Sequence, residues 1–169
     1  MHDTALQPGP DQARSAAARI GPFRRLLTLL REMSEPLQAV ENTNQGTRQI
    51  LVVDDDPSIR LLLRVIFESA GYAVTEAQHG RAALTRIETE LPDVVVTDLK
   101  MPVMGGGALI EHLRSDPRSM HLPIVAVTAD RNAKEVARKA NAILRKPFHH
   151  STLIETVHGL LEERALKAG

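Results

Sequence analysis

The stretch Ile50-Leu51-Val52-Val53-Asp54-Asp55 decides the fold, because a short apolar run ends there in two carboxylates. A second run, Val94-Val95-Val96-Thr97, ends in Asp98, and a third, Ile143-Leu144-Arg145, is followed by Lys146. Unbroken apolar runs rich in β-branched residues are typical of parallel strands that are covered on both faces. The carboxyl ends of such strands meet at one edge, where open α/β sheets bind their ligands. We therefore expect these charged side chains to share one crevice.

Strand-like and helix-like segments alternate from residue 49 onward. Asp56 is a good helix N-cap before Pro57 at the first helical position, and Gly71 is suited to end that helix. The alternation predicts an α/β fold, a (βα)5 three-layer sandwich around a parallel sheet. The expected strands are 50–54, 72–76, 94–97, 123–127 and 142–145, and the expected helices are 57–70, about 81–90, 107–115, about 133–139 and about 151–166.

Composition excludes several classes of protein. The chain has 21 basic and 21 acidic residues, so no net field attracts it to nucleic acid or a membrane surface. It has no cysteine, which rules out disulfides and thiolate metal sites. No apolar run reaches the roughly 18 residues of a transmembrane helix, and the amino terminus does not read as a secretory signal. We expect a cytoplasmic protein without a transmembrane segment.

The expected crevice has a specific chemistry. The carboxylates of Asp54, Asp55 and Asp98 would repel one another there unless a cation lies between them. Mg²⁺ relieves such repulsion, because it is a hard ion that prefers oxygen ligands. The ammonium of Lys146 beside a magnesium-bearing acidic cluster suits the site to receive a phosphoryl group.

Residues 49 to about 166 resemble a response-regulator receiver domain of two-component signalling, of the stand-alone, chemotaxis-regulator type. The resemblance implies a flavodoxin-like, doubly wound parallel sheet of five strands in the order 2-1-3-4-5. Four motifs carry it, each at a predicted strand end: Val52-Val53-Asp54-Asp55-Asp56, Thr97-Asp98-Leu99-Lys100-Met101-Pro102, Val127-Thr128-Ala129 and Lys146-Pro147-Phe148.

The resemblance assigns a role to each acidic position. Asp98 is expected to be the phosphoacceptor, a carboxylate nucleophile that forms an aspartyl phosphate and also ligates Mg²⁺. Asp55 is expected to ligate Mg²⁺ directly, whereas Asp54 holds metal-bound water. The backbone carbonyl of Lys100 completes the protein ligands.

The resemblance also assigns the residues around the phosphoryl group. Lys146 is expected to pair with phosphoryl oxygens, and Thr128 to hydrogen-bond one of them as a switch. The second switch position, usually aromatic, is Ile143, which has no ring to flip between exposed and buried states. Lys100 and Asp130 flank the path of the attacking water, and their opposite charges predict slow dephosphorylation.

Three further features concern the backbone. A cis peptide bond is expected at Lys146–Pro147, as in the family. The stretch from Thr128 to Lys146 is about four residues shorter than usual, roughly one helical turn, so the helix within it should be stunted. Gly105 stands where an aspartate commonly caps the third helix, and glycine serves there at a small cost.

The resemblance implies a phosphoacceptor regulator and not an enzyme, one that catalyses only its own phosphorylation and dephosphorylation. Its donor would be a histidine kinase or a histidine phosphotransfer protein, and it would signal to an unknown downstream protein. Nothing follows the last expected helix, so no DNA-binding domain is expected, and pairing as a homodimer is left open.

Two other functions are compatible with parts of the sequence. A haloacid-dehalogenase-like phosphatase also has Asp-x-Asp after a strand, as Asp54 and Asp56 are placed here. Such enzymes usually continue with Gly-Thr, whereas this chain has Pro57-Ser58. A flavodoxin-like flavin binder would need a hydroxyl-rich phosphate loop and flanking aromatic residues, and neither is present.

Two domains are expected: an extension, residues 1–48, and the receiver domain, residues 49–166. Within the extension, apolar and arginine residues at helical spacing over about 22–34 predict an amphipathic helix that docks on a partner or an anionic surface. The alternative is a disordered leader, and translation starting at Met33 in place of Met1 would remove most of it.

Overall fold

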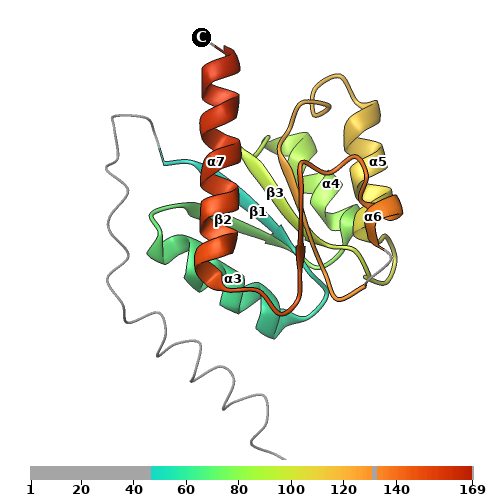
Figure 1. Cartoon of the computed structure of the whole chain (residues 1–169). Helices are drawn as coiled ribbons and strands as arrows, with labels where there is room; N and C mark the ends of the chain where they lie inside the picture. The colour runs from blue at the N-terminus through green and yellow to red at the C-terminus, as the bar shows by residue number, and fades with distance from the viewer. Residues whose placement is uncertain (1–46, 131–132, 169) are drawn as a thin grey trace, which may run out of the picture. The chain divides into compact units, whose positions relative to one another are not determined.

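The computed structural model describes residues 47–130 and 133–168 (Figure 1). The predicted amphipathic helix and both candidate start residues lie outside these ranges. The described elements are β1 (Gln49–Val53), α3 (Pro57–Ser69), β2 (Ala73–Ala77), α4 (Gly80–Thr89), β3 (Val94–Asp98), α5 (Gly106–Ser115), β4 (Ile124–Thr128), α6 (Ala133–Val136), β5 (Ala142–Arg145) and α7 (His150–Ala168).

The five strands form one parallel sheet in the order β2-β1-β3-β4-β5, as predicted. Because side chains alternate along a strand, each central strand contributes to two apolar cores. Leu51 and Val53 of β1 pack with residues of α4 and α5. Ile50 and Val52 pack with residues of α3 and α7 on the opposite face. Figure 1 shows this three-layer arrangement, with both faces of the sheet covered by helices.

Local signals explain where the elements begin and end. The Asp56 side chain accepts a hydrogen bond from the Ser58 N–H, and Pro57 occupies the first helical position of α3. Gly71 follows this helix with a φ of 87°, a left-handed conformation that favours glycine. Most predicted boundaries differ from the observed ones by one or two residues, which is typical of helix and strand ends.

The helix α6 is stunted, as the short stretch from Thr128 to Lys146 predicted. It spans Ala133–Val136, whereas a helix to about residue 139 was expected. The chain turns early, with the Ala140 N–H donating to the Ala137 carbonyl, and the Asn141 N–H then joins the Ile124 carbonyl of β4. A chain that must return to the sheet at Ala142 has no room for another helical turn.

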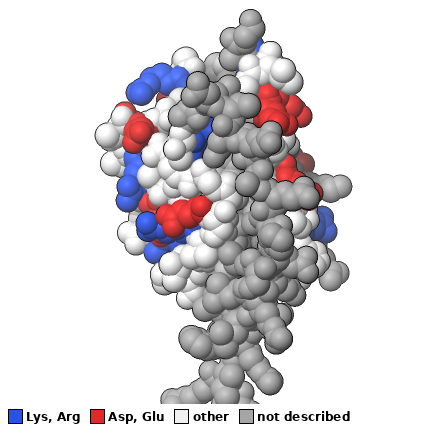
Figure 2. Space-filling view, turned by 90° about the vertical axis from the view of Figure 1, so that its left-hand side faces the viewer, with Lys and Arg blue, Asp and Glu red and all other residues white. Residues whose placement is uncertain are grey.

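Charges of both signs are interspersed on the visible surface. Figure 2 shows small groups of basic and acidic side chains side by side over the described part of one face, without a large patch of a single sign. This agrees with the formal net charge of zero. Within 47–130 and 133–168, no helix has both the length and the apolar character required to cross a bilayer.

Candidate functional site

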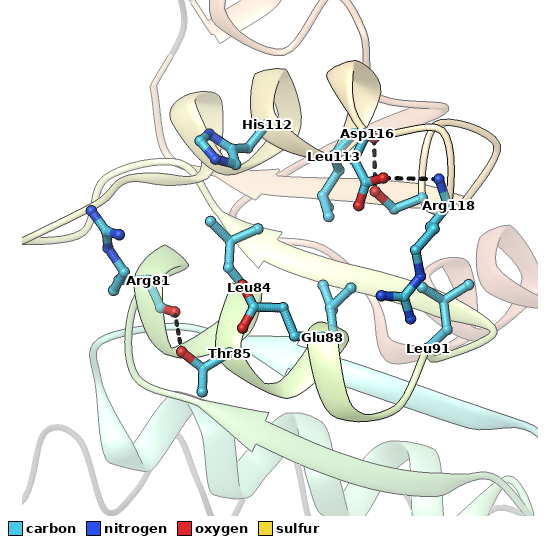
Figure 3. A pocket seen from close by; sticks show the side chains of 11 residues that line it. Arg81, Leu84, Thr85, Glu88, Leu91, His112, Leu113, Asp116 and Arg118 are labelled. Atoms are coloured by element: carbon cyan, nitrogen blue, oxygen red, sulfur yellow. Dashed lines mark hydrogen bonds between the residues drawn. The ribbon is translucent and has the colours of Figure 1, made fainter.

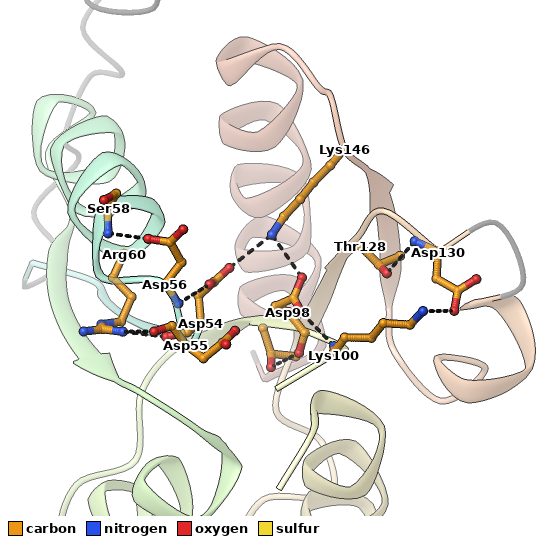
Figure 4. A network of polar contacts seen from close by, with 11 residues as sticks. Asp54, Asp55, Asp56, Ser58, Arg60, Asp98, Lys100, Thr128, Asp130 and Lys146 are labelled. Carbon is orange, nitrogen blue, oxygen red and sulfur yellow. Dashed lines mark hydrogen bonds and ion pairs between the residues drawn. The ribbon is translucent and has the colours of Figure 1, made fainter. Parts of the chain in front are cut away.

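Asp54, Asp98 and Lys146 meet at the carboxyl edge of the sheet (Figure 4). Asp54 directly follows β1 and Asp98 ends β3, and these two strands are neighbours in the sheet. The Lys146 Nζ lies 3.1 Å from Asp54 Oδ2 and 3.0 Å from Asp98 Oδ1. Its backbone N–H donates to the Thr128 carbonyl, and the predicted cis bond at Lys146–Pro147 is present. The predicted crevice is therefore formed. We call Asp54, Asp55, Asp98 and Lys146 the acidic edge.

Burial determines the electrostatics of this edge. The carboxyl groups belong to residues that are only 3% exposed for Asp54 and 9% for Asp98. Burial raises the pKa of Asp54, although the Asp56 N–H and the Lys146 ammonium oppose the change. Burial alone would lower the pKa of Lys146, but its hydrogen bond to Asp98 and the charge of Asp54 outweigh this, and the pKa lies above its ordinary value. Lys146 is therefore charged at neutral pH and holds the two carboxylates together.

The three consecutive aspartates have three different environments. Asp54 Oδ1 accepts the Asp56 N–H at 2.9 Å, so this side chain also fixes the turn after β1. Asp56 caps α3 and faces solvent. Asp55 is exposed, and its carboxylate makes no hydrogen bond or ion pair with another described residue. Of the three, Asp55 is therefore the carboxylate with all its oxygen lone pairs available to an incoming cation.

The described residues contain no three acidic or histidine side chains already grouped as a metal site. The expectation that Asp54, Asp55 and Asp98 lie within the reach of one ion is thus not met in this conformation, in which the Lys146 ammonium lies between two of them. The donor set still fits Mg²⁺ chemically. Asp54 and Asp98 share one ammonium, the Asp55 carboxylate next to Asp54 has no partner among the described residues, and the Lys100 carbonyl two residues after Asp98 is a further hard oxygen donor.

The backbone of Asp98 is held from two sides. Its carbonyl accepts the Thr97 hydroxyl at 2.8 Å, and its side-chain Oδ2 accepts the Lys100 N–H at 2.6 Å. The first residue of α5, Gly106, packs directly on this carbonyl, and a Cβ there would collide with it. Only glycine allows α5 to approach the end of β3 so closely, which fixes the position of Asp98.

The remaining predicted residues lie beside the edge. The Thr128 hydroxyl is buried at the end of β4 and accepts the Asp130 N–H at 3.0 Å. The Lys100 Nζ lies 3.0 Å from Asp130 Oδ2, so the two predicted opposite charges do form an ion pair. Ile143 is half-buried in β5 and packs against the core beneath α4 and α5.

Three polar side chains with structural roles were missed in the sequence. Arg60 donates to backbone carbonyls of the aspartate run, and its place one turn into α3 is a signal that was available. His79 Nδ1 accepts the Ala82 N–H at 3.0 Å and caps α4. Arg114 donates to the carbonyls of Met120, Leu122 and Lys139, and burial lowers its pKa. Its partners are distant in sequence, so no local pattern indicates them.

A groove of about 350 Å³ lies between α4 and α5 (Figure 3). None of the predicted site residues lines it. Side chains of both signs border a floor that includes Leu84 and Leu113, and Asp116 accepts the Arg118 N–H. This groove has no cluster of converging polar groups comparable to the acidic edge, which is therefore the candidate site.

Known proteins share this combination of fold and residues. A family model described as the response regulator receiver domain matches residues 50–158. Chemotaxis protein CheY-3 of Vibrio cholerae is 32% identical over 131 residues, which cover 75% of this chain and 98% of that protein. The sensor histidine kinase GacS of Pseudomonas protegens is 38% identical over 139 residues, 78% of this chain but only 15% of the kinase.

A solved structure shows the same fold. The response regulator protein TrrA of Thermotoga maritima, in complex with Mg²⁺ and BeF, has a TM-score of 0.63 and 29% identity, covering 68% of this chain and 99% of that one. The chain therefore belongs to the response regulator receiver family, the phosphoacceptor domains of two-component signalling. Receiver domains bind Mg²⁺ and receive phosphoryl groups from sensor histidine kinases. Nothing in these relationships favours the phosphatase alternative.

Proposed function

We propose that residues 49–166 accept a phosphoryl group on Asp98 from a histidine kinase or a histidine phosphotransfer protein and then signal by protein contact. The observation that carries the proposal is the Lys146 ammonium, which is held 3.0 Å from Asp98 Oδ1 and 3.1 Å from Asp54 Oδ2. The nucleophilic carboxylate and the cation that would neutralise the incoming phosphoryl oxygens are thus already side by side.

The transfer needs a positioned nucleophile more than a proton acceptor. A carboxylate oxygen of Asp98 attacks the phosphorus atom, the bond from phosphorus to the donor nitrogen breaks, and the imidazole keeps that electron pair. The hydrogen bond from the Lys100 N–H and the packing of Gly106 orient Asp98 for an in-line approach. Lys146 turns from the two carboxylates to the phosphoryl oxygens, and Thr128 donates its hydroxyl to one of them.

Asp54, Asp55, Asp98 and the Lys100 carbonyl would hold Mg²⁺, with Asp54 acting through water. When bound, the ion neutralises charge on the phosphoryl oxygens during the transfer. The Asp55 carboxylate has no other partner in the described part of the chain, so binding the ion does not break an existing contact of that side chain. Asp54 would keep its hydrogen bond from the Asp56 N–H.

The proposal extends to the role of the whole chain. The protein acts only on its own phosphoryl group and passes the signal to a downstream protein, with a homodimer as one form in which it does so. The likeness to CheY-3, nearly all of which is matched, supports a stand-alone role. The likeness to a segment of the sensor kinase GacS supports a histidine kinase as the phosphodonor.

Phosphorylation of the purified protein by acetyl phosphate, followed by intact mass spectrometry, tests the proposal. We expect the mass of one phosphoryl group to be added with Mg²⁺ and none with a chelator. Asp98→Asn should abolish the addition. Retention of a hydroxylamine-sensitive phosphate in that variant would place the acceptor elsewhere.

Asp56→Asn is the matched control, since it changes another acid of the same region. Asparagine is as good an N-cap as aspartate, so α3 should be unaffected. The variant should take up phosphate like the wild type. Loss of uptake in Asp56→Asn alone would instead indicate an Asp54/Asp56 phosphatase-like site.

A further inference from the structure

The loop that carries the acid run, residues 54–56, is tied to the rest of the protein by Arg60 (Figure 4). The Arg60 Nη1 donates to the backbone carbonyl of Asp54 at 2.7 Å and to that of Asp55 at 3.2 Å. Its Nε lies 3.3 Å from Glu76 Oε2 on β2. The Arg60 side chain is only 17% exposed, and its contacts with the Asp54 carbonyl and with Glu76 are partly buried, whereas the one with the Asp55 carbonyl is exposed.

The hydrogen bonds from Arg60 hold the backbone at Asp55, the proposed ligand whose side chain contacts no other described residue. The Asp54 side chain is held by the Asp56 N–H and by Lys146, and the Asp54 N–H donates to the Ala77 carbonyl. The exposed Asp55 carboxylate has no such contact among the described residues, so its place depends on the backbone alone. Arg60 is the side chain that bonds the carbonyl of Asp55 itself.

We propose that Arg60, anchored by Glu76, is a positioning residue for metal binding, which holds the backbone of residues 54–55 so that the Asp55 carboxylate is presented to Mg²⁺. This inference rests on the proposed function. Outer partners of metal ligands orient the ligands, and their loss typically weakens binding by 10–100-fold. Arg60 acts on the backbone of a ligand and does not touch the ion.

Glu76 has a second effect, on charge. A guanidinium beside a cation site would by itself repel the ion, but the Glu76 carboxylate at 3.3 Å compensates that charge. Arg64 shares Glu76 but also pairs with Glu68, so the two arginines and the two glutamates balance in charge, and Arg60 can hold the loop without a net electrostatic cost to Mg²⁺. Removing Glu76 should weaken Mg²⁺ binding for two reasons. Arg60 loses the ion pair that holds its side chain in place, and the charge of its guanidinium is no longer compensated near the metal site.

Isothermal titration calorimetry of the full chain with Mg²⁺ tests the proposal. Arg60→Met should bind Mg²⁺ about tenfold more weakly than the wild type. At saturating Mg²⁺ its phosphate uptake should return to the wild-type level, because Asp98 and Lys146 are intact. A purely structural role would lower the melting temperature in a chelator and leave the Mg²⁺ affinity unchanged. Arg60→Lys keeps one donor group, so its Mg²⁺ affinity should lie between those of the wild type and Arg60→Met.

Arg64→Met is the matched control. Arg64 lies one turn further along α3 and contacts Glu76 Oε1 at 3.3 Å and Glu68 Oε1 at 2.7 Å, so it shares an anchor but bonds no carbonyl of the loop. Its Mg²⁺ affinity should match the wild type. Wild-type affinity in Arg60→Met would overturn the inference, and so would wild-type affinity in Glu76→Gln, which keeps Arg60. If the wild type itself binds no Mg²⁺, the proposed metal site fails and the inference fails with it.

Discussion

The acidic edge and the segment 133–145, which contains α6 and β5, are built in different ways. At the edge, charged residues directly follow buried strands, and the turns after them are fixed by bonds between residues two apart, such as Asp54 to Asp56 and Asp98 to Lys100. The segment 133–145 has a short helix and a strand that is half-buried or exposed. Much of its anchoring comes from another helix, through Arg114.

This difference indicates in which region a substitution affects both phosphoryl transfer and stability, and in which region it affects stability alone. A substitution of Asp54, Asp98 or Lys146 changes a buried or partly buried charge, which is costly in any setting and, under the proposed function, also affects phosphoryl transfer. A substitution in 133–145 changes packing in one of the two apolar cores, as Ile143 packs in one core and Leu144 in the other. We therefore expect edge variants to lose stability and chemistry together, and variants of 133–145 to lose stability alone.

Lys146→Met should give the largest loss of stability among the variants compared here. It leaves two buried carboxylates without their ammonium. Breaking a buried pair typically costs 3–5 kcal/mol, and about 2–3 kcal/mol is expected here because 29% of the lysine side chain is exposed. Chemical denaturation at neutral pH in a chelator measures this cost. Mg²⁺ should stabilise the variant more than the wild type, since it replaces the missing cation.

The pH dependence of that difference has a defined sign. The pKa of Lys146 is raised in the folded protein, so its contribution is complete below the ordinary lysine value of 10.5 and is lost as the pH rises through the raised value. The stability gap between wild type and Lys146→Met should stay constant from pH 7 to 9 and close above 10.5. A gap that already narrows below pH 9 would mean that the ion pair is not its source.

Ile143→Ala should give a smaller effect confined to stability. Full truncation of a completely buried isoleucine costs about 2–5 kcal/mol, so about 1–2 kcal/mol is expected for this half-buried side chain. Phosphate uptake from acetyl phosphate should be unchanged when measured below the melting transition. A large loss of uptake would couple the segment 133–145 to the acidic edge and break the comparison.

The two regions also differ in how far the sequence predicted them. The crevice and the Asp56 cap were predicted correctly from local signals, the apolar runs and the residues that follow them. The strand order and the cis bond at Lys146–Pro147 were also predicted correctly, but from the resemblance to receiver domains. The length of α6 was overestimated. Periodicity alone does not include the requirement that the chain return to β4 at Asn141.

The main features that the sequence did not predict are hydrogen bonds between side chains and backbone groups far apart in the sequence. Arg114 bonds carbonyls that lie 6–25 residues away, and such partners become visible only when the helices are placed. Three carboxylates around one ion were expected, whereas the structure has the Lys146 ammonium between Asp54 and Asp98. The motif indicates which carboxylates lie near one another but not which cation lies between them.

The ion pair between Lys100 and Asp130 lies beside the acidic edge, because Lys100 follows β3 and Asp130 follows β4. The Nζ to Oδ2 distance is 3.0 Å, and the Lys100 side chain is 75% exposed. An exposed pair is worth only about 0–1 kcal/mol. If it must open before water reaches the phosphoryl group, it slows hydrolysis at most about fivefold.

Lys100→Asn should therefore accelerate the loss of phosphate from Asp98 by up to about fivefold, measured as the decay of the phosphorylated mass after the donor is removed. The Lys100 carbonyl is retained, so Mg²⁺ binding should not change. Lys139→Asn is the control, since it breaks an ion pair with Glu111, away from the acidic edge. High salt should bring the wild-type rate toward that of the variant, because the Debye length falls to about 3 Å at 1 M. Equal decay rates in the wild type and Lys100→Asn at low salt would show that this ion pair does not obstruct the water.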